Sequence, residues 1–515
     1  MASAVDHRTT RRRPPAAAGP SGALPPLVAT VLWHAHAERV GELALLDDVS
    51  RISRVEPAFA APHGGEKRPL GDVHLSRRPM LELSVIAGGL RLTRLAPGEL
   101  RLDGASSQGE RVELGDAALA EGVVLELEER VALLVHRRPR PRAGPALGLL
   151  GGSAAIDGVR AEVCTLAPLT SAVLVRGETG TGKELVAAAL HQASARRAGP
   201  FVAVNLAALP SAVAAAALFG HRKGAFTGAV EGNPGYFRQA AGGTLFLDEI
   251  GAAPLDVQAM LLRALEQSEI QPVGAPTPEA VDVRILAATD ADLEAAVAGG
   301  AFREALLHRL GAATLRVPPL RARRDDIARL LLAFVREELA ARGAEERLAP
   351  RAAEDAPWLS ARFVAAACRA PWSGNVRALR NLCRRMAARY ADVDVVPDDA
   401  GARELAAAGA APASPASVEG ARPAPRAEAR LTDAEILQAL EEHGWQVGRA
   451  AAALGLARNT VYAAMERAGH GAARALDRAQ IVAAVDAAAG ELARAARALR
   501  VSERALKLRM RELDL

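Results

Sequence analysis

A glycine-rich run that ends in lysine is the first part of this sequence that could do chemistry. It follows a short apolar run and opens a helical pattern that continues to His191. In that context, backbone N–H groups can wrap phosphates, and the lysine can place a positive charge on their outer oxygens at a helix N-terminus. A plain glycine turn is a much weaker interpretation. The predicted nucleotide-binding residues are Gly177, Glu178, Thr179, Gly180, Thr181, Gly182, Lys183 and Glu184.

Two carboxylates, Asp248 and Glu249, follow the apolar run 245–247. A buried strand would deliver them at its carboxyl end, where open α/β sheets bind ligands. We expect Asp248 to hold Mg²⁺ through water and Glu249 to polarise the water that attacks the γ-phosphate of ATP. An isolated Asp-Glu pair is usually a solvated strand end, but this pair comes after a phosphate loop. Glu184 stands where most such loops have Ser or Thr for the metal, so one expected ligand is missing.

The chain that positions these groups has 515 residues, enough for three or four domains. After Gly151, apolar strands alternate with helical stretches, which predicts a mostly parallel α/β sheet. Shorter apolar runs broken by Gly, Pro and Asp come earlier and predict a β-sandwich. We therefore predict a multidomain fold with a disordered basic arm at 1–30, the sandwich at 31–136, a charged linker at 137–150, the α/β core at 151–320, a helical lid at 321–400, a second linker at 401–430, and all-α units at 431–470 and 476–515.

The composition excludes several classes of protein. A net charge of +4 is only mildly basic, so nucleic-acid binding must come from a local patch. Three widely separated cysteines indicate neither a disulfide framework nor a zinc site. The sequence shows no signal-peptide core and no apolar run near the roughly 20 residues of a membrane span. We expect a cytoplasmic protein that does not contact the membrane.

Five further motifs lie between residues 201 and 377. They are Phe201-Val-Ala-Val-Asn205, Leu218-Phe-Gly-His221, Lys223-Gly-Ala-Phe-Thr-Gly-Ala229, Gly243-Thr-Leu-Phe-Leu-Asp-Glu-Ile-Gly251 and Trp372-Ser-Gly-Asn-Val-Arg377. Together they resemble the AAA+ domain of sigma-54-dependent transcriptional activators, also called bacterial enhancer-binding proteins. The resemblance covers roughly residues 150–390, and in that family the phosphate loop ordinarily ends in Lys-Glu, so Glu184 fits the pattern.

The resemblance implies further roles within an ATPase. Asn205 would couple the nucleotide state to Glu249, and Arg377 would sense the nucleotide from the lid. Arg303 and Arg309 match arginine fingers that complete a neighbour's site, which implies self-association as a dimer and as a ring, by resemblance a hexamer. Without the resemblance, both arginines would be interpreted as surface salt-bridge formers.

Three departures from the family pattern concern turnover and assembly. Asp290 stands where the family usually has Asn, and it would place another negative charge near the phosphates and slow hydrolysis. The stretch 211–218 lacks the usual acidic residues, and Arg238 replaces a usual glutamate. We expect these last two changes to alter ring contacts more than chemistry.

One loop of the core offers no acid, base or charge for catalysis. Its phenylalanine and flanking glycines suit a loop that presents an aromatic side chain to a partner. By resemblance, Phe226 and Thr227 engage sigma-54 RNA polymerase and move with the nucleotide cycle. A buried aromatic in a tight turn is the plainer alternative. The residues of this loop are Gly224, Ala225, Phe226, Thr227, Gly228 and Ala229.

The unit at 431–470 reads as three helices and resembles the Fis-type helix-turn-helix. Its expected recognition helix begins with short polar and cationic side chains that can reach base edges in the major groove of DNA. A helical pair used only for dimerisation is the alternative. The predicted DNA-binding residues are Arg449, Arg458, Asn459, Thr460 and Tyr462.

A degenerate second copy of this unit follows at an offset of 45 residues. From Arg494 to Arg511 it carries seven cationic residues and one acidic residue. It would read a second half-site or strengthen phosphate contacts. An ordinary solvated helix face is the alternative.

The N-terminal sandwich lacks a receiver pattern. Two segments, Ile52-Ser-Arg54 and Leu75-Ser-Arg-Arg78, resemble elements of a forkhead-associated (FHA) domain, which binds phosphothreonine. By resemblance, Arg54, Ser76 and Arg77 would be the phosphate contacts, and a phosphothreonine protein would be a partner. The usual following His and later Asn-Gly are missing, and Asp103-Gly104 is the nearest substitute. A sandwich that serves dimerisation or inhibition is the alternative.

These features predict a sigma-54-dependent transcriptional activator that binds upstream enhancer DNA. It would couple ATP hydrolysis to remodelling of the sigma-54 RNA polymerase closed complex under control of the FHA-like domain. The alternative is a DNA-binding regulator that no longer acts through sigma-54 or that hydrolyses ATP poorly.

Overall fold

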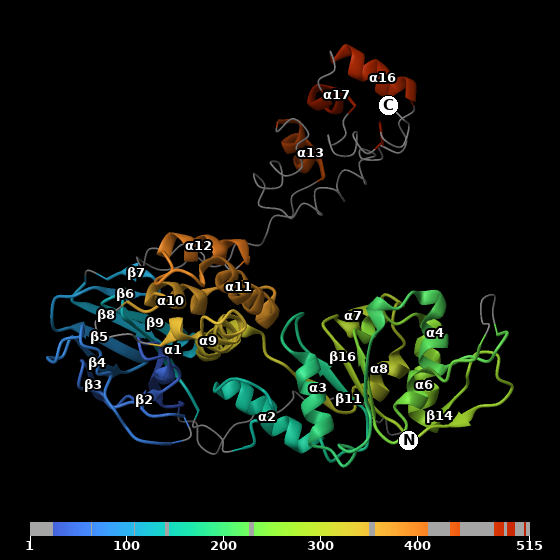
Figure 1. Ribbon diagram of the computed structural model, residues 1–515, viewed down its shortest axis with the longest axis horizontal. Helices are drawn as coiled ribbons and strands as arrows, with labels where there is room; N and C mark the ends of the chain where they lie inside the picture. Colours follow the sequence, from blue (N-terminus) through green and yellow to red (C-terminus); the bar gives the residue numbers. More distant parts are fainter. Residues whose placement is uncertain are drawn as a thin grey trace, which may run out of the picture. The chain divides into compact units, whose positions relative to one another are not determined.

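The computed structural model describes residues 24–62, 64–107, 109–139, 144–225, 231–349, 356–409, 433–442, 478–488, 492–499 and 509–510. The chain divides into two compact units, residues 1–417 and 418–515. The first unit contains the sandwich, the α/β core and the lid, and the second contains the C-terminal helices (Figure 1).

Two antiparallel sheets form the N-terminal β-sandwich. One has the strand order β2-β1-β10-β9-β6-β7, and the other has the order β3-β4-β5-β8. Leucines from both sheets, among them Leu83, Leu92 and Leu133, fill the space between them. The elements are β1 (Leu27–Trp33), η1 (Ala37–Arg39), β2 (Leu43–Leu45), β3 (Val49–Ile52), β4 (Leu81–Ile86), β5 (Gly89–Arg94), β6 (Leu100–Leu102), β7 (Ala105–Ser106), β8 (Arg111–Gly115), α1 (Asp116–Glu121), β9 (Val123–Leu127) and β10 (Val131–Arg137).

The start of β1 corrects the predicted end of the disordered arm. Leu27 to Thr30 lie inside the span 1–30, yet they pair with β10 in a register that sets Leu27 opposite Arg137. The proline-rich composition just upstream concealed an apolar run that is long enough to form a buried strand.

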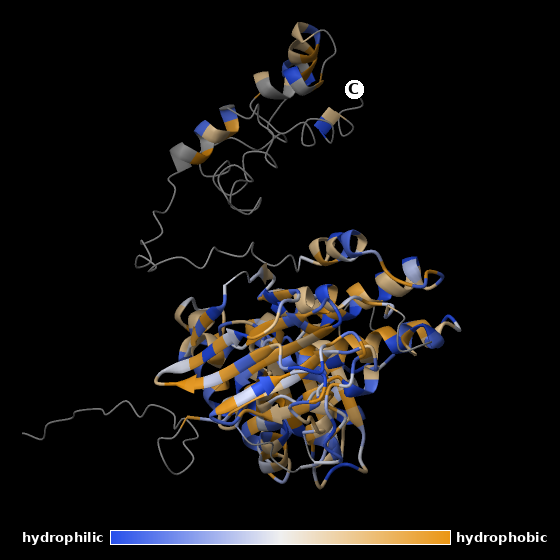
Figure 2. Ribbon diagram, turned by 90° about the vertical axis from the view of Figure 1, so that its left-hand side faces the viewer, coloured by the Kyte–Doolittle hydropathy of each residue, from blue (hydrophilic) through white to orange (hydrophobic). Residues whose placement is uncertain are grey.

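Strands β1, β9 and β10 are buried on both faces. In β10, Leu133 and Val135 face the other sheet, while Ala132 and Leu134 pack with the lid. Side chains alternate between the two faces of a strand, so a strand covered on both sides is apolar along its length. Figure 2 shows such hydrophobic stretches in orange along strands of the first unit.

The α/β core has five parallel strands in the order β12-β13-β16-β11-β17. Helices α2 and α3 pack on one face, and the other face is covered by α4 to α8. The strands are β11 (Val173–Arg176), β12 (Phe201–Asn205), β13 (Thr244–Asp248), β16 (Arg284–Thr289) and β17 (Thr314–Arg316), beside the hairpin of β14 (Glu269–Ile270) and β15 (Glu279–Ala280). The helical elements are α2 (Ala154–Leu166), α3 (Lys183–Gln192), η2 (Leu206–Ala208), α4 (Ser211–Phe219), α5 (Gly235–Gln239), η3 (Ile250–Ala252), α6 (Leu255–Gln267), α7 (Leu293–Ala298) and α8 (Glu304–Leu310).

The lid is helical and is longer than predicted. Its last helix continues past residue 400, so the second linker starts later than the predicted 401. Arg385 and Arg389 both pair with Glu404, which is 2% exposed, and these pairs fix that helix against the lid. The elements are η4 (Leu320–Ala322), α9 (Arg324–Ala340), η5 (Glu345–Leu348), α10 (Ala361–Arg369), α11 (Asn375–Tyr390) and α12 (Asp398–Ala407).

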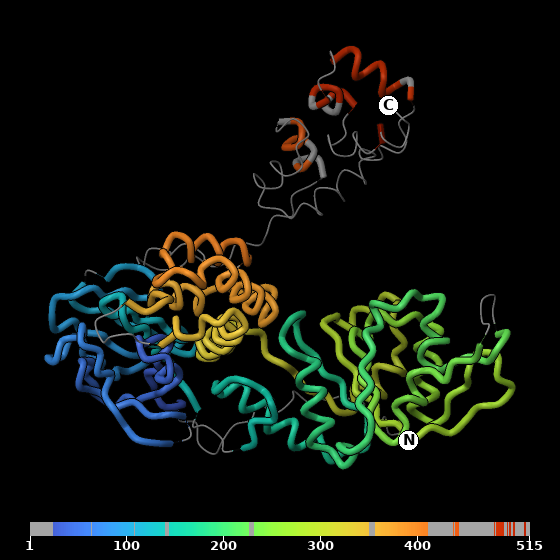
Figure 3. The backbone as a smooth tube through the Cα atoms, viewed as in Figure 1, coloured from blue at the N-terminus to red at the C-terminus, as the bar shows by residue number. Residues whose placement is uncertain are grey.

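After building the core, the chain returns to the sandwich as the lid (Figure 3). Helix α10 contacts β1, β9 and β10, and α9 contacts β1. Leu32 and Val124 of the sandwich share one apolar cluster with Phe334 and Val364 of the lid. We call this contact the sandwich–lid seam.

The second unit contains α13 (Asp433–Glu442), α16 (Arg478–Ala487) and α17 (Leu492–Ala498). Each end of α16 lies 45 residues after the same end of α13, which matches the repeat in the sequence. Ile436 and Ile481, equivalent in that repeat, are both buried. None of the helices in the described part of the chain has the length and apolar character needed to cross a membrane.

Candidate nucleotide-binding site

The phosphate loop joins the end of β11 to the start of α3. Gly180 and Gly182 have φ angles of 79° and 97°, a region that strongly favours glycine. A Cβ on Gly180 would lie 2.4 Å from the backbone oxygen of Gly374, so the lid also requires glycine there. Lys183 donates from Nζ to the backbone oxygen of Gly177 over 2.9 Å. The loop is thus folded around its own lysine, at the N-terminus of α3.

Asp248 and Glu249 line the same cavity as the phosphate loop, and its volume is about 500 Å³. Glu249 Oε1 lies 3.7 Å from Lys183 Nζ. Burial raises the pKa of Glu249, Lys183 opposes that shift, and the nearby carboxylates of Asp290 and Asp248 add to it. This environment suits a group that must accept a proton.

Asn205 and Asp290 approach this pair from β12 and β16. Asn205 donates from Nδ2 to Asp248 Oδ2 over 3.3 Å, so its hydrogen bond is to the residue before Glu249. Its coupling of the nucleotide state to Glu249 stays a prediction. Asp290 accepts a short hydrogen bond from Thr179 Oγ1, which lowers its pKa. The Asp290 carboxylate is therefore tied to the phosphate loop and remains charged beside Glu249.

The lid closes onto the phosphate loop through contacts that the sequence did not predict. Asn375 donates from Nδ2 to the backbone oxygen of Thr179 over 3.0 Å and accepts at Oδ1 from the backbone N–H of Leu320 over 2.8 Å. Glu178 accepts two hydrogen bonds from Arg321, over 2.5 and 2.7 Å, and they lower the pKa of Glu178 to about 2. Asn375 lies inside the motif 372–377, so a signal for it existed, whereas none marked Arg321.

Apolar side chains line another part of the cavity and would suit a nucleotide base. Leu149, Ile156 and Phe334 are among them. Arg380 lies over the Phe334 ring at 5.4 Å from its centroid and pairs with Glu337 over 2.5 Å. The predicted residues Glu184 and Arg377 also line the cavity, and Arg377 N–H contacts the backbone oxygen of Gly180 over 3.3 Å. The cavity thus joins charged groups suited to phosphates with an apolar wall.

Comparison with known proteins shows which family has this arrangement. Residues 149–316 match the Sigma-54 interaction domain, residues 321–408 the AAA+ ATPase lid domain, and residues 433–467 the Fis family of bacterial regulatory proteins. The C4-dicarboxylate transport transcriptional regulatory protein DctD of Rhizobium meliloti is 41% identical over 357 residues, which cover 68% of this chain and 72% of that protein. The chain belongs to the family of sigma-54-interacting transcriptional regulators.

Other relatives match a smaller part of their own length. The DNA-binding transcriptional regulator NtrC of Escherichia coli is 43% identical over 284 residues, 53% of this chain and 58% of NtrC. The chain thus spans 58% of that relative. A solved structure of NtrX from Brucella abortus in complex with ATP is 30% identical and covers 63% of this chain and 69% of that chain, with a TM-score of 0.43.

The two predicted arginine fingers of this sigma-54-interacting regulator lie on α8 and at its N-terminus, away from the cavity of their own chain. Arg303 donates from Nε to the backbone oxygen of Leu255 over 3.1 Å, and Arg309 donates from Nη2 to that of Leu265 over 3.1 Å. Both side chains are exposed, and neither lines the nucleotide cavity. Within one chain, they do not join the other predicted catalytic residues.

The predicted sigma-54 contact lies partly outside the described residues, which include Gly224 and Ala225 but not Phe226, Thr227, Gly228 or Ala229. The base of the loop is framed by two backbone hydrogen bonds between His221 and Asn233, over 2.9 and 3.0 Å. Ala225 packs close to Gly274, where a Cβ would lie 3.0 Å from the Cβ of Ala225. The loop therefore leaves the core from a fixed base.

The predicted DNA contacts of this regulator lie outside the described residues. They are Arg449, Arg458, Asn459, Thr460 and Tyr462.

The three predicted phosphopeptide contacts belong to two adjacent loops of the sandwich. Arg54 N–H donates to the backbone oxygen of Ser76 over 2.8 Å, and Ser76 Oγ accepts from the Arg78 N–H over 3.0 Å. Ser76 and Arg77 are exposed. The substitute pair Asp103-Gly104 faces the lid instead, because a Cβ on Gly104 would lie 2.6 Å from an Arg369 nitrogen. The sandwich is thus an antiparallel β-domain with a cationic loop pair, and its resemblance to an FHA domain stays a prediction.

Proposed function

We propose that this protein is a DNA-binding activator that couples ATP hydrolysis to remodelling of the sigma-54 RNA polymerase closed complex. The observation that carries the proposal is the cavity shared by Lys183, Asp248 and Glu249, which the lid closes through Asn375. The same core holds the loop at 224–229 on a fixed base. The nucleotide state of the cavity would therefore affect the loop, which presents Phe226 and Thr227 to sigma-54.

The acidic groups of the cavity fit Mg²⁺ bound together with the nucleotide. The described residues contain no cluster of three or more metal-ligating side chains. Mg²⁺ commonly takes one or two carboxylates, several waters and the phosphates of its nucleotide. Asp248 would hold the ion through water, with Asn205 orienting its carboxylate, and the ion would supply charge to the phosphates. Glu249 would then accept a proton from the attacking water.

Ring assembly would complete this site. Arg303 and Arg309 are exposed and outside their own cavity, as side chains that act in a neighbour would be. An arginine supplied from another subunit makes hydrolysis depend on assembly. DNA binding by the Fis-type unit would raise the local concentration of subunits and so favour the ring.

We also propose that the sandwich regulates the ATPase through the lid. Arg369 of α10 pairs with the buried Glu126 of β9 over 2.7 Å, and Arg324 of α9 donates to the backbone oxygen of Gly122 over 3.0 Å. Movement of the sandwich would therefore move the lid. The lid in turn contacts the phosphate loop through Asn375.

Two adjacent aspartates at the start of α9 strengthen this argument. Asp325 lies 3.6 Å from Arg138, which follows the last strand of the sandwich. Asp326 accepts from the backbone N–H of Ser153 over 2.8 Å and from its Oγ over 2.6 Å, where the core begins. One turn of helix thus joins the end of the sandwich to the start of the core. Binding of a phosphothreonine peptide at Arg54, Ser76 and Arg77 would be one signal that uses this path.

Transcription from a sigma-54 promoter, measured together with ATP turnover, tests the main proposal. Thr227→Ala should retain turnover and lose activation, because the loop offers no acid, base or charge for catalysis. Equal activation by wild type and Thr227→Ala would contradict the sigma-54 role.

Glu249→Gln tests the ATPase separately. It should bind ATP and reduce turnover by about 10²- to 10⁴-fold, the range of a general base. Equal background turnover in wild type and Glu249→Gln would favour the alternative, a DNA-binding regulator that hydrolyses ATP poorly. The charge of Asp290 beside Glu249 is the observation that keeps that alternative open.

A further inference from the structure

One glutamine of α6 is completely buried. Gln258 is 0% exposed, although glutamine side chains are mostly found on protein surfaces. Helix α6 packs against α8, and side chains of both helices, among them Leu261 and Leu306, belong to one apolar cluster. A polar side chain in such a place must find its hydrogen-bond partners within the protein.

The side chain of Gln258 makes three hydrogen bonds, all to backbone groups. Its Nε2 donates to the backbone oxygen of Ala253 over 2.8 Å and to that of Ala301 over 3.0 Å. Its Oε1 accepts from the Arg303 N–H over 2.8 Å. A side-chain amide offers two donor hydrogens and an acceptor oxygen, so Gln258 matches all three groups in one orientation.

The two segments that Gln258 joins lead to two parts of the proposed reaction. Ala253 directly follows η3, which begins right after Glu249, and the Ala252 N–H donates to the backbone oxygen of Glu249 over 2.9 Å. Ala301 and Arg303 belong to the turn before α8. One buried side chain thus ties the loop after the proposed general base to the residue that would act in a neighbour's site.

The backbone of Arg303 is fixed, whereas its side chain is exposed. Arg303 N–H is held by Gln258, and the Arg303 backbone oxygen accepts from the Leu307 N–H over 3.1 Å at the start of α8. The guanidinium makes a surface hydrogen bond to the backbone oxygen of Leu255, a bond that can be exchanged for one to a phosphate. Gln258 therefore sets the point from which the arginine side chain reaches outward.

We propose that Gln258 is a positioning residue that holds Arg303 for the neighbouring subunit and connects it to the loop after Glu249. The inference rests on the proposed ring function of Arg303 and adds to it a route between adjacent sites. A shift of Glu249 and η3 in one subunit would move Gln258, and with it the arginine offered to the next subunit. A displacement of about 1 Å at a catalytic group can lower a rate by about 10²-fold, so the bond at the base of Arg303 matters for turnover.

Mixed rings of full-length variants test the proposal. Gln258→Leu removes all three hydrogen bonds with a side chain of similar size, and it should lower ATP turnover by about 10²-fold. Glu249→Gln has lost the base of its own site but carries a normally held Arg303. When the two variants are mixed in equal amounts before ATP is added, a Gln258→Leu subunit beside a Glu249→Gln subunit regains a correctly placed arginine. Turnover of the mixture should exceed the mean of the two variants by about tenfold.

Three further variants serve as controls. Arg303→Ala mixed with Glu249→Gln should show the same recovery, because it removes the same arginine directly. Gln267→Leu makes the same change at an exposed glutamine of α6 and should hydrolyse ATP as wild type does. Gln258→Leu should bind ATP with wild-type affinity, since Gln258 does not line the nucleotide cavity. If that affinity is lost through misfolding, Gln258→Glu takes its place, because it keeps the size of the side chain and the acceptor for Arg303 N–H.

The outcomes separate this inference from the proposed function. Recovery with Arg303→Ala but not with the Gln258 variant would overturn the inference alone, because Gln258 would then act only within its own subunit. Wild-type turnover by the Gln258 variant without a partner would also overturn it. No recovery with Arg303→Ala would contradict the ring function of Arg303, and the inference with it.

Discussion

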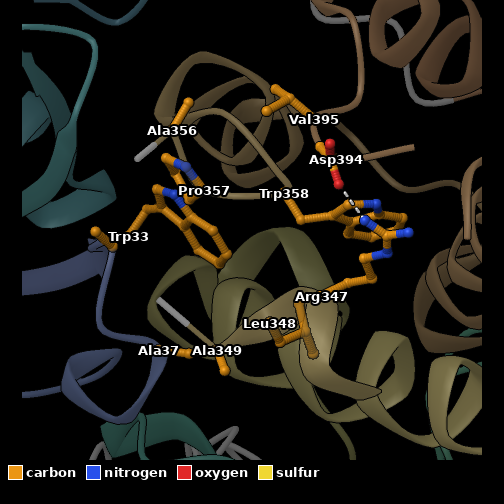
Figure 4. Close-up of a pocket in the computed structure, with 11 residues that line it drawn as sticks. Trp33, Ala37, Arg347, Leu348, Ala349, Ala356, Pro357, Trp358, Asp394 and Val395 are labelled. Carbon is orange, nitrogen blue, oxygen red and sulfur yellow. Dashed lines mark hydrogen bonds and ion pairs between the residues drawn. The ribbon is translucent and has the colours of Figure 1, made fainter. Parts of the chain in front are cut away.

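The lid has two contact faces that differ in chemistry. At the nucleotide cavity, it meets the phosphate loop through Asn375 and Arg321, which bind backbone oxygens and a carboxylate. At the seam, it meets the sandwich mainly through apolar side chains, two tryptophans among them (Figure 4), with the Arg369–Glu126 ion pair beside them. The first contact suits a charged ligand and can open and close by exchanging hydrogen bonds with water. The second buries apolar area and is costly to separate.

The two faces of the lid therefore have different roles. Polar contacts at the phosphate loop can respond to the nucleotide state. The apolar seam would keep the sandwich attached while that response takes place, unless a ligand or a modification changes the seam itself. Variants on the two sides should therefore affect different measurements.

Removing the phosphate-binding charge should have the largest effect. Lys183→Ala should lower ATP turnover by about 10²- to 10³-fold, because Lys183 is the cation of the phosphate loop, at the N-terminus of α3, where the outer phosphate oxygens would lie. A radiolabelled ATPase assay would measure it. Lys67→Ala, on the exposed surface of the sandwich, is the matched control. Turnover in Lys183→Ala equal to that of the control would show that the cavity is not the site of hydrolysis.

Substitutions at two neighbouring residues of β10 should distinguish the seam from the sandwich core. Leu133→Ala and Leu134→Ala should each cost about 2 to 5 kcal/mol, since each leaves a cavity among buried side chains. Amide hydrogen exchange, followed by mass spectrometry, would locate the loss. Leu133→Ala should increase exchange in β4 and β5, whereas Leu134→Ala should increase it in α9 and α10.

The same exchange pattern in both variants would contradict this division, because it would mean that the sandwich and the lid open as one unit. Wild-type rates in α10 of Leu134→Ala would contradict the seam itself. Sandwich strands that remain protected in Leu134→Ala serve as its internal control.

The sequence predicted the nucleotide cavity better than the seam, for a physical reason. The phosphate loop and the Asp-Glu pair are short, local motifs, because a bound phosphate requires glycine, lysine and carboxylate at fixed spacings. The parallel direction of β12, β13, β16 and β11 follows from their alternation with helices, whereas their order in the sheet required the structure. The match to the Sigma-54 interaction domain confirms this part of the fold prediction.

The seam could not be predicted from local pattern. Leu134 and Ala132 look like any other residues of a buried strand, and nothing in the sequence says which face of β10 meets another domain. Trp33 and Trp358 are 325 residues apart and have no shared motif. Asn375 was predictable only in part. The motif that contains it is visible in the sequence, but its contact with Thr179 can be seen only in the fold.

Loss of the lid contact at the phosphate loop should have a moderate effect. Asn375→Ala removes the hydrogen bonds to Thr179 and Leu320, so ATP affinity should fall by about tenfold. Binding of a fluorescent ATP analogue would measure it. Asn381→Ala, exposed on the same helix, is the control, and hydrogen exchange across the seam should remain at wild-type rates. Increased exchange in β10 of Asn375→Ala would show that loss of the phosphate-loop contact also opens the seam.

The smallest expected effect concerns the pH dependence of turnover. Burial is the main reason that the pKa of Glu249 is raised, and the carboxylate of Asp290 adds to the shift. Only ionised Glu249 can accept a proton from water, so turnover should fall as the pH decreases through this raised pKa. Asp290→Asn removes one negative charge, lowers the pKa of Glu249, and should move the acid limb of the profile to lower pH. A pH series of ATPase rates would show it, with Asp292→Asn as the control because Asp292 instead caps α7. An unmoved acid limb in Asp290→Asn would mean that Asp290 does not influence the base, and that its bond to Thr179 serves only to hold the phosphate loop.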